Sequence, residues 1–267
     1  MKTHTTHPDK MHRRPLLLAV AAGLASLLSP ASARAGLIYS DTFNGSSANG
    51  LTGTTPGTTS GTFGGTAGAT WSAKDEVFKA DGSVVTGFGG GSAALPFTPQ
   101  TGQKYTLSAT VDTTVGGANW IGLGFEEHSF PPGAFDLPDN NGYAWMILRE
   151  TRGGNQGAYL LGPTITGPSG SFDTGSGPLN LAVVLDTSAA NWTAQYFVDG
   201  SAVSAAVAYA VNPTIGFAGF STINSGGGTV DNFSLDVAPV PEPGTLAVGL
   251  LCLGAGMARR RRSARVA

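Results

Sequence analysis

Short apolar runs separated by turn residues recur along the middle of the chain, and several alternate with a period of two. In residues 105–111 the odd positions are apolar and the even positions carry hydroxyl groups, which is the pattern of a strand with one buried face. We find no sustained apolar spacing at the helical period. The runs that predict strands are Leu37–Phe43, Thr70–Ser72, Val77–Lys79, Tyr105–Val111, Trp120–Phe125, Tyr143–Arg149, Ala158–Leu161, Leu179–Leu185, Trp192–Val198, Ile215–Phe220 and Val230–Val237.

These runs predict an all-β domain over residues 36–238, an antiparallel jelly-roll β-sandwich of about a dozen strands. Asp199-Gly200 after an apolar run predicts a hairpin turn. Residues 87–92 begin like a dinucleotide-binding fingerprint, but no helix follows, and we interpret them as a glycine-rich turn. Residues 53–70 are mostly glycine and threonine without charge. They predict a flexible surface loop, and O-linked sugars on its hydroxyl groups are the functional alternative.

The chain is poor in charge and rich in turn formers. Charged residues make up 12% of its 267 residues, and it has 40 glycines and 16 prolines; a typical soluble domain is about 25% charged. This favours strands and tight turns over a helical bundle. Residues 36–240 carry five basic and fifteen acidic residues, a net charge of −10. Nucleic acid is therefore excluded as a partner, because its phosphates require a basic surface.

Residues 1–35 have the three parts of an export signal. A basic start precedes an apolar run of 13 residues at 16–28, and small residues follow, with Ala33 and Ala35 predicted as the cleavage signal. The apolar run is shorter than the roughly 20 residues that span a bilayer. The sequence thus predicts a signal peptide read by the export machinery. Arg13-Arg14 leaves both the general secretory and the twin-arginine route open.

Residues 239–267 combine a proline-flanked acid, an apolar stretch and a basic tail. Pro241-Glu242-Pro243 predicts an extended, exposed segment. The 14 apolar residues at 245–258 predict a short transmembrane segment, marginal as a permanent anchor. In the basic tail at 259–265, four arginines should stop transfer and stay on the cytoplasmic side. These are Arg259, Arg260, Arg261 and Arg262.

This order of tripeptide, apolar helix and basic cluster resembles the PEP-CTERM sorting signal of Gram-negative bacteria over residues 239–262. The resemblance implies that Pro241, Glu242 and Pro243 form the sorting motif and that an exosortase is the processing partner. It also implies transient insertion into the inner membrane, followed by delivery to the cell surface or the extracellular matrix. An ordinary tail anchor without processing is the alternative.

A second resemblance covers most of the domain. It rests on the leading strand at 38–43, the strands at 179–185 and 192–198, and the closing strands at 216–220 and 230–235. This order is similar to the concanavalin-like or laminin-G-like jelly rolls often found in front of PEP-CTERM tails. Such jelly rolls host lectins, glycosidases and structural modules alike, so the fold leaves the function open.

Two candidate binding features lie close together in the sequence. The loop at 136–142 places four oxygen-bearing side chains within seven residues, and calcium takes six to eight oxygen ligands. Asp136, Asp139 and Asn141 are therefore candidate calcium ligands, although Asp and Asn also favour plain turns. Trp145 follows this loop, and together with Asn140 it is the candidate for stacking on and binding a sugar. Core packing is the alternative for this tryptophan.

The residues do not form a recognisable catalytic set. His128 is the one histidine of the exported part, and no G-x-S-x-G motif or pair of alternating carboxylates is present. We interpret Glu126-Glu127-His128 as a solvated loop end. We therefore expect a non-catalytic, exported surface or matrix protein that binds extracellular polysaccharide, with calcium as its one candidate cofactor. A purely structural or adhesive matrix component and a secreted glycan hydrolase or lyase are the alternatives.

Overall fold

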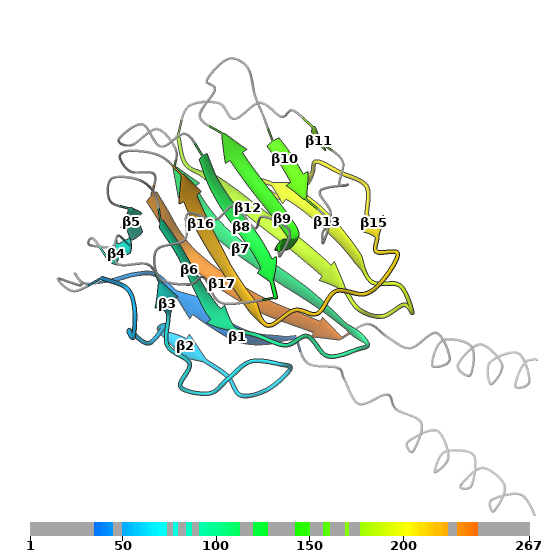
Figure 1. Ribbon diagram of the computed structural model, residues 1–267, viewed down its shortest axis with the longest axis horizontal. Coiled ribbons are helices and arrows are strands. Elements are labelled where there is room, and N and C mark those ends of the chain that lie inside the picture. The colour runs from blue at the N-terminus through cyan, green and yellow to red at the C-terminus, as the bar shows by residue number, and fades with distance from the viewer. Residues whose placement is uncertain are drawn as a thin grey trace, which may run out of the picture. The chain divides into compact units, whose positions relative to one another are not determined.

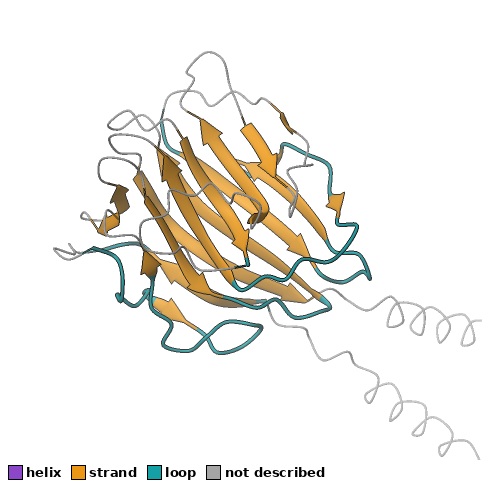
Figure 2. Ribbon diagram, in the orientation of Figure 1, coloured by secondary structure: helices purple, strands orange, loops and turns teal. Residues whose placement is uncertain are grey.

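The computed structural model describes residues 35–44, 50–73, 77–79, 84–86, 91–112, 120–127, 142–149, 157–160, 169–170, 177–223 and 229–239. These residues form strands, turns and loops, and none of them is helical (Figure 2). Within these ranges no helix is long and apolar enough to cross a membrane. The predicted signal peptide up to residue 34, the sorting tripeptide and the apolar segment at 245–258 lie outside the described residues.

A ten-stranded sheet forms one layer of the domain (Figure 1). Its continuous order is β14-β13-β12-β7-β17-β1-β2, with β15 beside β13 and the β4–β5 hairpin beside β17. The strands of this sheet are β1 (Gly36–Asp41), β2 (Thr58–Thr59), β4 (Val77–Lys79), β5 (Val84–Thr86), β7 (Gln103–Asp112), β12 (Leu179–Asp186), β13 (Thr193–Val198), β14 (Ser201–Ala202), β15 (Val207–Ala208) and β17 (Thr229–Pro239).

A seven-stranded sheet in the order β11-β10-β9-β8-β16-β6-β3 forms the second layer. Its strands are β3 (Ser72–Ala73), β6 (Gly91–Pro96), β8 (Trp120–Glu126), β9 (Gly142–Arg149), β10 (Gly157–Leu160), β11 (Ser169–Gly170) and β16 (Phe217–Ile223). Every pairing among the described strands is antiparallel. The predicted all-β, antiparallel fold class is thereby confirmed.

The core lies between the two sheets and follows the period-two pattern of the sequence. In β7 and β12, buried residues alternate with partly exposed ones, as the alternation at 105–111 predicts. The hairpin turn is also confirmed: Val198 pairs with Ser201, and Asp199 and Gly200 both have positive φ angles, 47° and 75°. Positive φ at both central residues is the geometry of a two-residue hairpin turn that matches the strand twist.

Two interpretations of short segments are wrong. Gly91 and Ser92, read as the end of a glycine-rich turn, open the six-residue strand β6, whose first five residues are buried. A strand buried on both faces has no polar alternation to reveal it. Glu126, read as part of a solvated loop end, is the last residue of β8 and is 3% exposed.

The threonine-rich segment at 53–70 is largely exposed but is fastened to the first strand. Its short strand β2 pairs with Tyr39 and Ser40 of β1. The Tyr39 hydroxyl accepts a hydrogen bond from the Thr66 backbone N–H and donates one to the Pro96 carbonyl, both at 2.6 Å. Burial of this hydroxyl raises the pKa of Tyr39. Tyr39 therefore joins the ten-stranded sheet both to the loop and to β6 of the seven-stranded sheet.

A buried carboxylate organises the aromatic part of the core. Asp41 is 4% exposed, and it accepts hydrogen bonds from the Trp71 indole N–H and the Phe43 backbone N–H, each at 2.8 Å. The Trp71 ring packs against Phe233 and Phe220, with centroid separations of 5.0 and 5.6 Å. The first bond holds the Trp71 indole in place, and the second holds the Asp41 carboxylate that accepts it.

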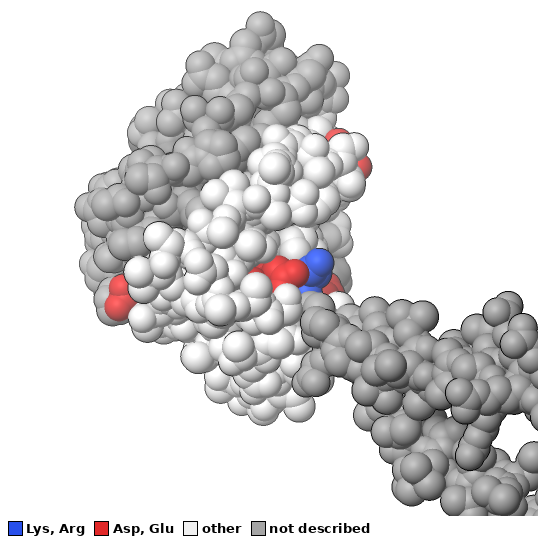
Figure 3. Space-filling model, turned by 90° about the vertical axis from the view of Figure 1, so that its right-hand side faces the viewer, with Lys and Arg blue, Asp and Glu red and all other residues white. Residues whose placement is uncertain are grey.

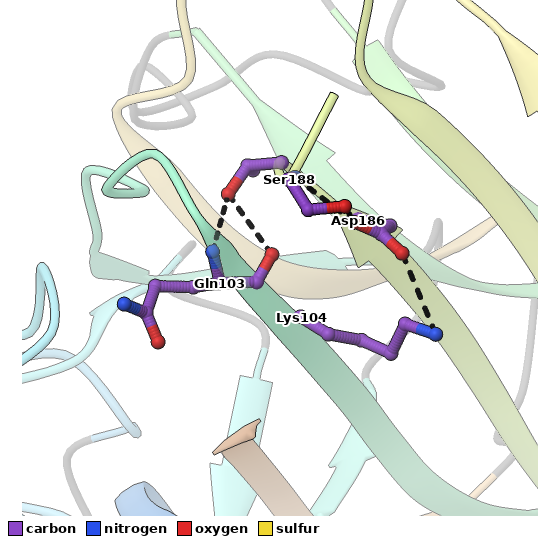
Figure 4. A network of polar contacts seen from close by, with 5 residues as sticks. Gln103, Lys104, Asp186 and Ser188 are labelled. Atoms are coloured by element: carbon purple, nitrogen blue, oxygen red, sulfur yellow. Dashed lines mark hydrogen bonds and ion pairs between the residues drawn. The ribbon is translucent and has the colours of Figure 1, made fainter. Parts of the chain in front are cut away.

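A polar network joins β7 to the end of β12 (Figure 4). The Lys104 ammonium lies 3.4 Å from the Asp186 carboxylate, which also accepts hydrogen bonds from the Ser188 hydroxyl and backbone N–H. Burial alone would raise the pKa of Asp186, but the bonds from Ser188 and the charge of Lys104 outweigh it and hold that pKa below its ordinary value. Elsewhere charge is sparse, and the described surface in Figure 3 is mostly uncharged.

Asp41→Asn should destabilise the domain by about 2 kcal/mol, because the amide places an N–H₂ group against a buried N–H donor. Urea unfolding followed by tryptophan fluorescence measures this loss. Asp236→Asn is the matched control on the exposed side of β17, and it should change stability by less than about 0.5 kcal/mol. Equal effects of the two substitutions would contradict the organising role of Asp41.

The stability that the Asp186 network contributes should depend on pH. Because the folded-state pKa lies below the ordinary value of 3.8, ionised Asp186 stabilises the fold above that pH, and this contribution is lost as the pH falls through the folded-state pKa. The difference in melting temperature between the wild type and Asp186→Asn should therefore shrink between about pH 6 and about pH 2. A difference that stays constant over this range would refute the assignment.

Candidate functional site

The seven-stranded sheet has a second face, directed away from the core, which we call the outer face. In β8 the residues Ile121, Leu123 and Phe125 belong to the core, so Gly122 and Gly124 between them face the other way. The same alternation assigns further outer-face residues on the neighbouring strands. These are Ser92 and Ala94 of β6, Gly219 and Ser221 of β16, and Trp145 and Ile147 of β9.

The strand register arranges the middle of the outer face in rows of small residues. Ser92, Ser221 and Gly122 are successive partners across β6, β16 and β8. Ala94, Gly219 and Gly124 form the adjacent row. A floor of glycine, alanine and serine lets another group approach the sheet backbone closely.

Trp145 lies flat on this floor. The β8–β9 register shifts between Leu123 and Phe125, and Ala144 of β9 has a φ of 47°, a conformation that non-glycine residues seldom adopt. A β-bulge of this kind redirects the side chain next to it. A Cβ atom at Gly122 would overlap the indole nitrogen of Trp145, and one at Gly124 would lie 2.5 Å from the ring atom Cε3. The two glycines therefore form the seat of the indole.

Two buried hydroxyl groups on this floor have no hydrogen-bond partner among the described residues. Ser92 and Ser221 are each 1% exposed, and their Oγ atoms bond neither to each other nor to another described group. By contrast, the cross-strand pair Ser108 and Ser234 on the ten-stranded sheet is hydrogen-bonded at 2.9 Å. Buried polar groups without partners are rare in folded proteins, so each requires an explanation. A hydroxyl-bearing ligand would satisfy both.

Glu126 supplies the one carboxyl group among the described outer-face residues. It lies opposite Phe217 of β16 at the end of β8 and is buried. Glycosidic cleavage uses two carboxyl groups held roughly 5–10 Å apart. On β8, where alternate positions share this face, the two positions before Glu126 are glycines.

The structure describes one of the five residues expected to bind a ligand or a metal. Trp145 is on the outer face, but it is fully buried, at 0% exposure. Asp136, Asp139, Asn140 and Asn141 lie outside the described residues. In the part of the chain that the structure describes, no group of three or more His, Cys, Asp or Glu residues could hold a metal ion. Ser92 and Ser221 were not expected as site residues.

Residues 239–262 match the family described as the PEP-CTERM protein-sorting motif. This match bears out the resemblance seen in the tripeptide, the apolar stretch and the arginines. The motif marks an exported protein that is processed at the membrane, and it implies an exosortase as the processing enzyme. No curated protein matches the chain.

Among solved structures, the chain is similar to an endo-1,3-β-glucanase from Streptomyces sioyaensis, with 13% identity, coverage of 79% of this chain and 98% of that one, and a TM-score of 0.48. The carbohydrate recognition domain of Emp47p is 16% identical, with coverage of 80% and 100% and a TM-score of 0.47. The lumenal domain of VIP36, bound to Ca²⁺ and Man3GlcNAc, is 11% identical, with coverage of 64% and 84% and a TM-score of 0.42. All three TM-scores are below 0.5.

Gly122→Ala should cost about 1–3 kcal/mol, because the added methyl group forces the Trp145 indole off its seat. In a Trp145→Ala background the same change should cost little, so a double-mutant cycle in urea should give a clear coupling energy. Gly57→Ala is the control, since its Cβ would meet one atom at 3.4 Å. Additive effects at 122 and 145 would show that the indole does not lie on Gly122.

Proposed function

We propose that the exported domain binds extracellular polysaccharide through the outer face of its seven-stranded sheet and does not cleave it. The observation that carries the proposal is the pair of buried, unpartnered hydroxyls of Ser92 and Ser221 beside Trp145. A sugar ring offers hydroxyl groups as donors and acceptors together with an apolar ring face. Serine hydroxyls and an indole complement these two features.

Opening of the face is part of this proposal. Trp145 and both serines are buried, so a ligand reaches them only after the face becomes accessible. The strained φ of Ala144, directly before Trp145, supports a movable indole, because backbone strain of this kind concentrates at binding and switching sites. In the bound state the small-residue floor would admit the ligand close to the sheet.

The proposal includes calcium and delivery to the surface. Asp136, Asp139 and Asn141 would supply oxygen ligands to a calcium ion, with Asn140 and Trp145 next to it in sequence. The domain would occupy residues 36–238, after removal of a signal peptide at Ala33 and Ala35. An exosortase reading Pro241-Glu242-Pro243 would release it to the cell surface or matrix of a Gram-negative bacterium.

The test is a binding assay of residues 36–240 against a panel of polysaccharides, with and without calcium. Ser92→Ala and Ser221→Ala should each weaken binding about fivefold, the equivalent of one lost hydrogen bond. Neither should lower the melting temperature, because each removes a buried hydroxyl that has no partner. Ser108→Ala and Ser234→Ala are matched controls on the other sheet and should leave binding unchanged.

The outcomes separate three functions. Saturable binding that the outer-face variants weaken supports the proposal. A folded domain that binds no glycan refutes it and leaves a structural or adhesive matrix component. The buried carboxyl of Glu126 on the same face is the observation that favours a glycan hydrolase or lyase. Release of reducing ends that stops in Glu126→Gln would establish that second candidate instead.

A further inference from the structure

The last strand of the domain ends two residues before the sorting tripeptide. β17 extends to Pro239, and the tripeptide begins at Pro241. An extended chain advances at most about 3.6 Å per residue, so this linker spans about 7 Å. Enzymes that read short peptide motifs commonly bind them as extended segments that include flanking residues. The folded domain therefore stands close to the point that the processing enzyme must bind.

The end of β17 is attached on one side only. β1 begins at Gly36, opposite Val237, and its described pairing with β17 covers no residue beyond Val237. Among the described residues, Ala238 and Pro239 pair only with β7, opposite Lys104 and Gln103. The last two residues are thus an edge segment, whereas the centre of β17 has a neighbour on each side.

The final pair of residues, Pro239 and Gln103, offers few hydrogen bonds between the two strands. Proline has no backbone N–H to donate. The Gln103 backbone is engaged on its other side, where its N–H donates to the Thr187 hydroxyl at 3.0 Å and its carbonyl accepts from the Thr187 N–H at 2.8 Å. The Gln103 side-chain Oε1 is buried without a partner among the described residues. Separation of Pro239 from Gln103 therefore breaks few interactions, and the backbone pairing of Ala238 with Lys104 is the main contact that opening must break.

We propose that the end of β17 is a gate on sorting: Ala238 and Pro239 must separate from β7 before the membrane enzyme can process the tripeptide. The separation adds Ala238 and Pro239 to the stretch of chain between the sheet and the tripeptide. It leaves the rest of β17 in the sheet, held by β1 and β7. This inference rests on the proposed exosortase processing and adds a requirement for partial opening of the fold.

The test uses a disulfide in the full-length chain to hold the end of β17 against β7. The sole native cysteine is Cys252, so Cys252→Ser gives a clean background. Lys104→Cys with Ala238→Cys links two opposed residues whose Cα separation, about 5.5 Å in a hydrogen-bonded pair, suits a disulfide. The matched control is Thr106→Cys with Asp236→Cys, two residues further into the same ladder and on the same face. Processing is followed by product mass in cells that contain the exosortase.

We expect the 104–238 clamp to abolish processing, reductant to restore it, and the 106–236 clamp to leave it intact. A flexible spacer of about six Gly and Ser residues after Pro239 should raise the processing rate and should rescue the clamped chain. Equal processing of the two clamped chains would overturn the gate while leaving the sorting function in place. A wild-type chain that is not processed, or is processed equally after Glu242→Ala, would refute both.

Discussion

Burial of the seven-stranded sheet on both faces is the constraint from which the site follows. A sheet with one wet face can place bulky polar groups outward, but here the outward positions of β6, β8 and β16 are buried too. In the middle rows of this face, such positions favour side chains that neither project far nor need water, whereas Glu126 lies at the end of β8. Glycine, alanine and serine are all small enough, but the serine hydroxyls need a hydrogen-bond partner. The two unpartnered hydroxyls are thus an exception that packing alone does not explain.

The main strands of the ten-stranded sheet were predictable because only one face of this sheet is buried. Its outer face is in contact with water, so β7 and β12 alternate strictly and their patterns appear in the sequence. β6 was missed for the complementary reason: Ala93, Ala94 and Leu95 are all buried, and a continuous run of small apolar residues after glycines reads as a turn. Local periodicity reports exposure as much as secondary structure.

The site was predictable only in part. The place of Trp145 after an oxygen-rich segment of the sequence predicts a binding residue, and the structure places it on the outer face, but buried. Its seat on Gly122 and Gly124 depends on the register of β8 against β9 and on the bulge at Ala144. Likewise Ser92 and Ser221 become neighbours only through the pairing of β6 with β16. Pairing between segments so distant in sequence leaves no local signal.

The adjacency of the first and last strands governs when the domain can finish folding. β1 has its main partner in β17, at the far end of the chain, so the sheet stays open along that line until the last strand arrives. Closing so long a loop is entropically costly, and folds dominated by distant contacts form slowly. In a chain that crosses a membrane from its N-terminus, β1 emerges first and β17 last. For a chain exported in the unfolded state, completion of the sandwich would therefore coincide with the end of export.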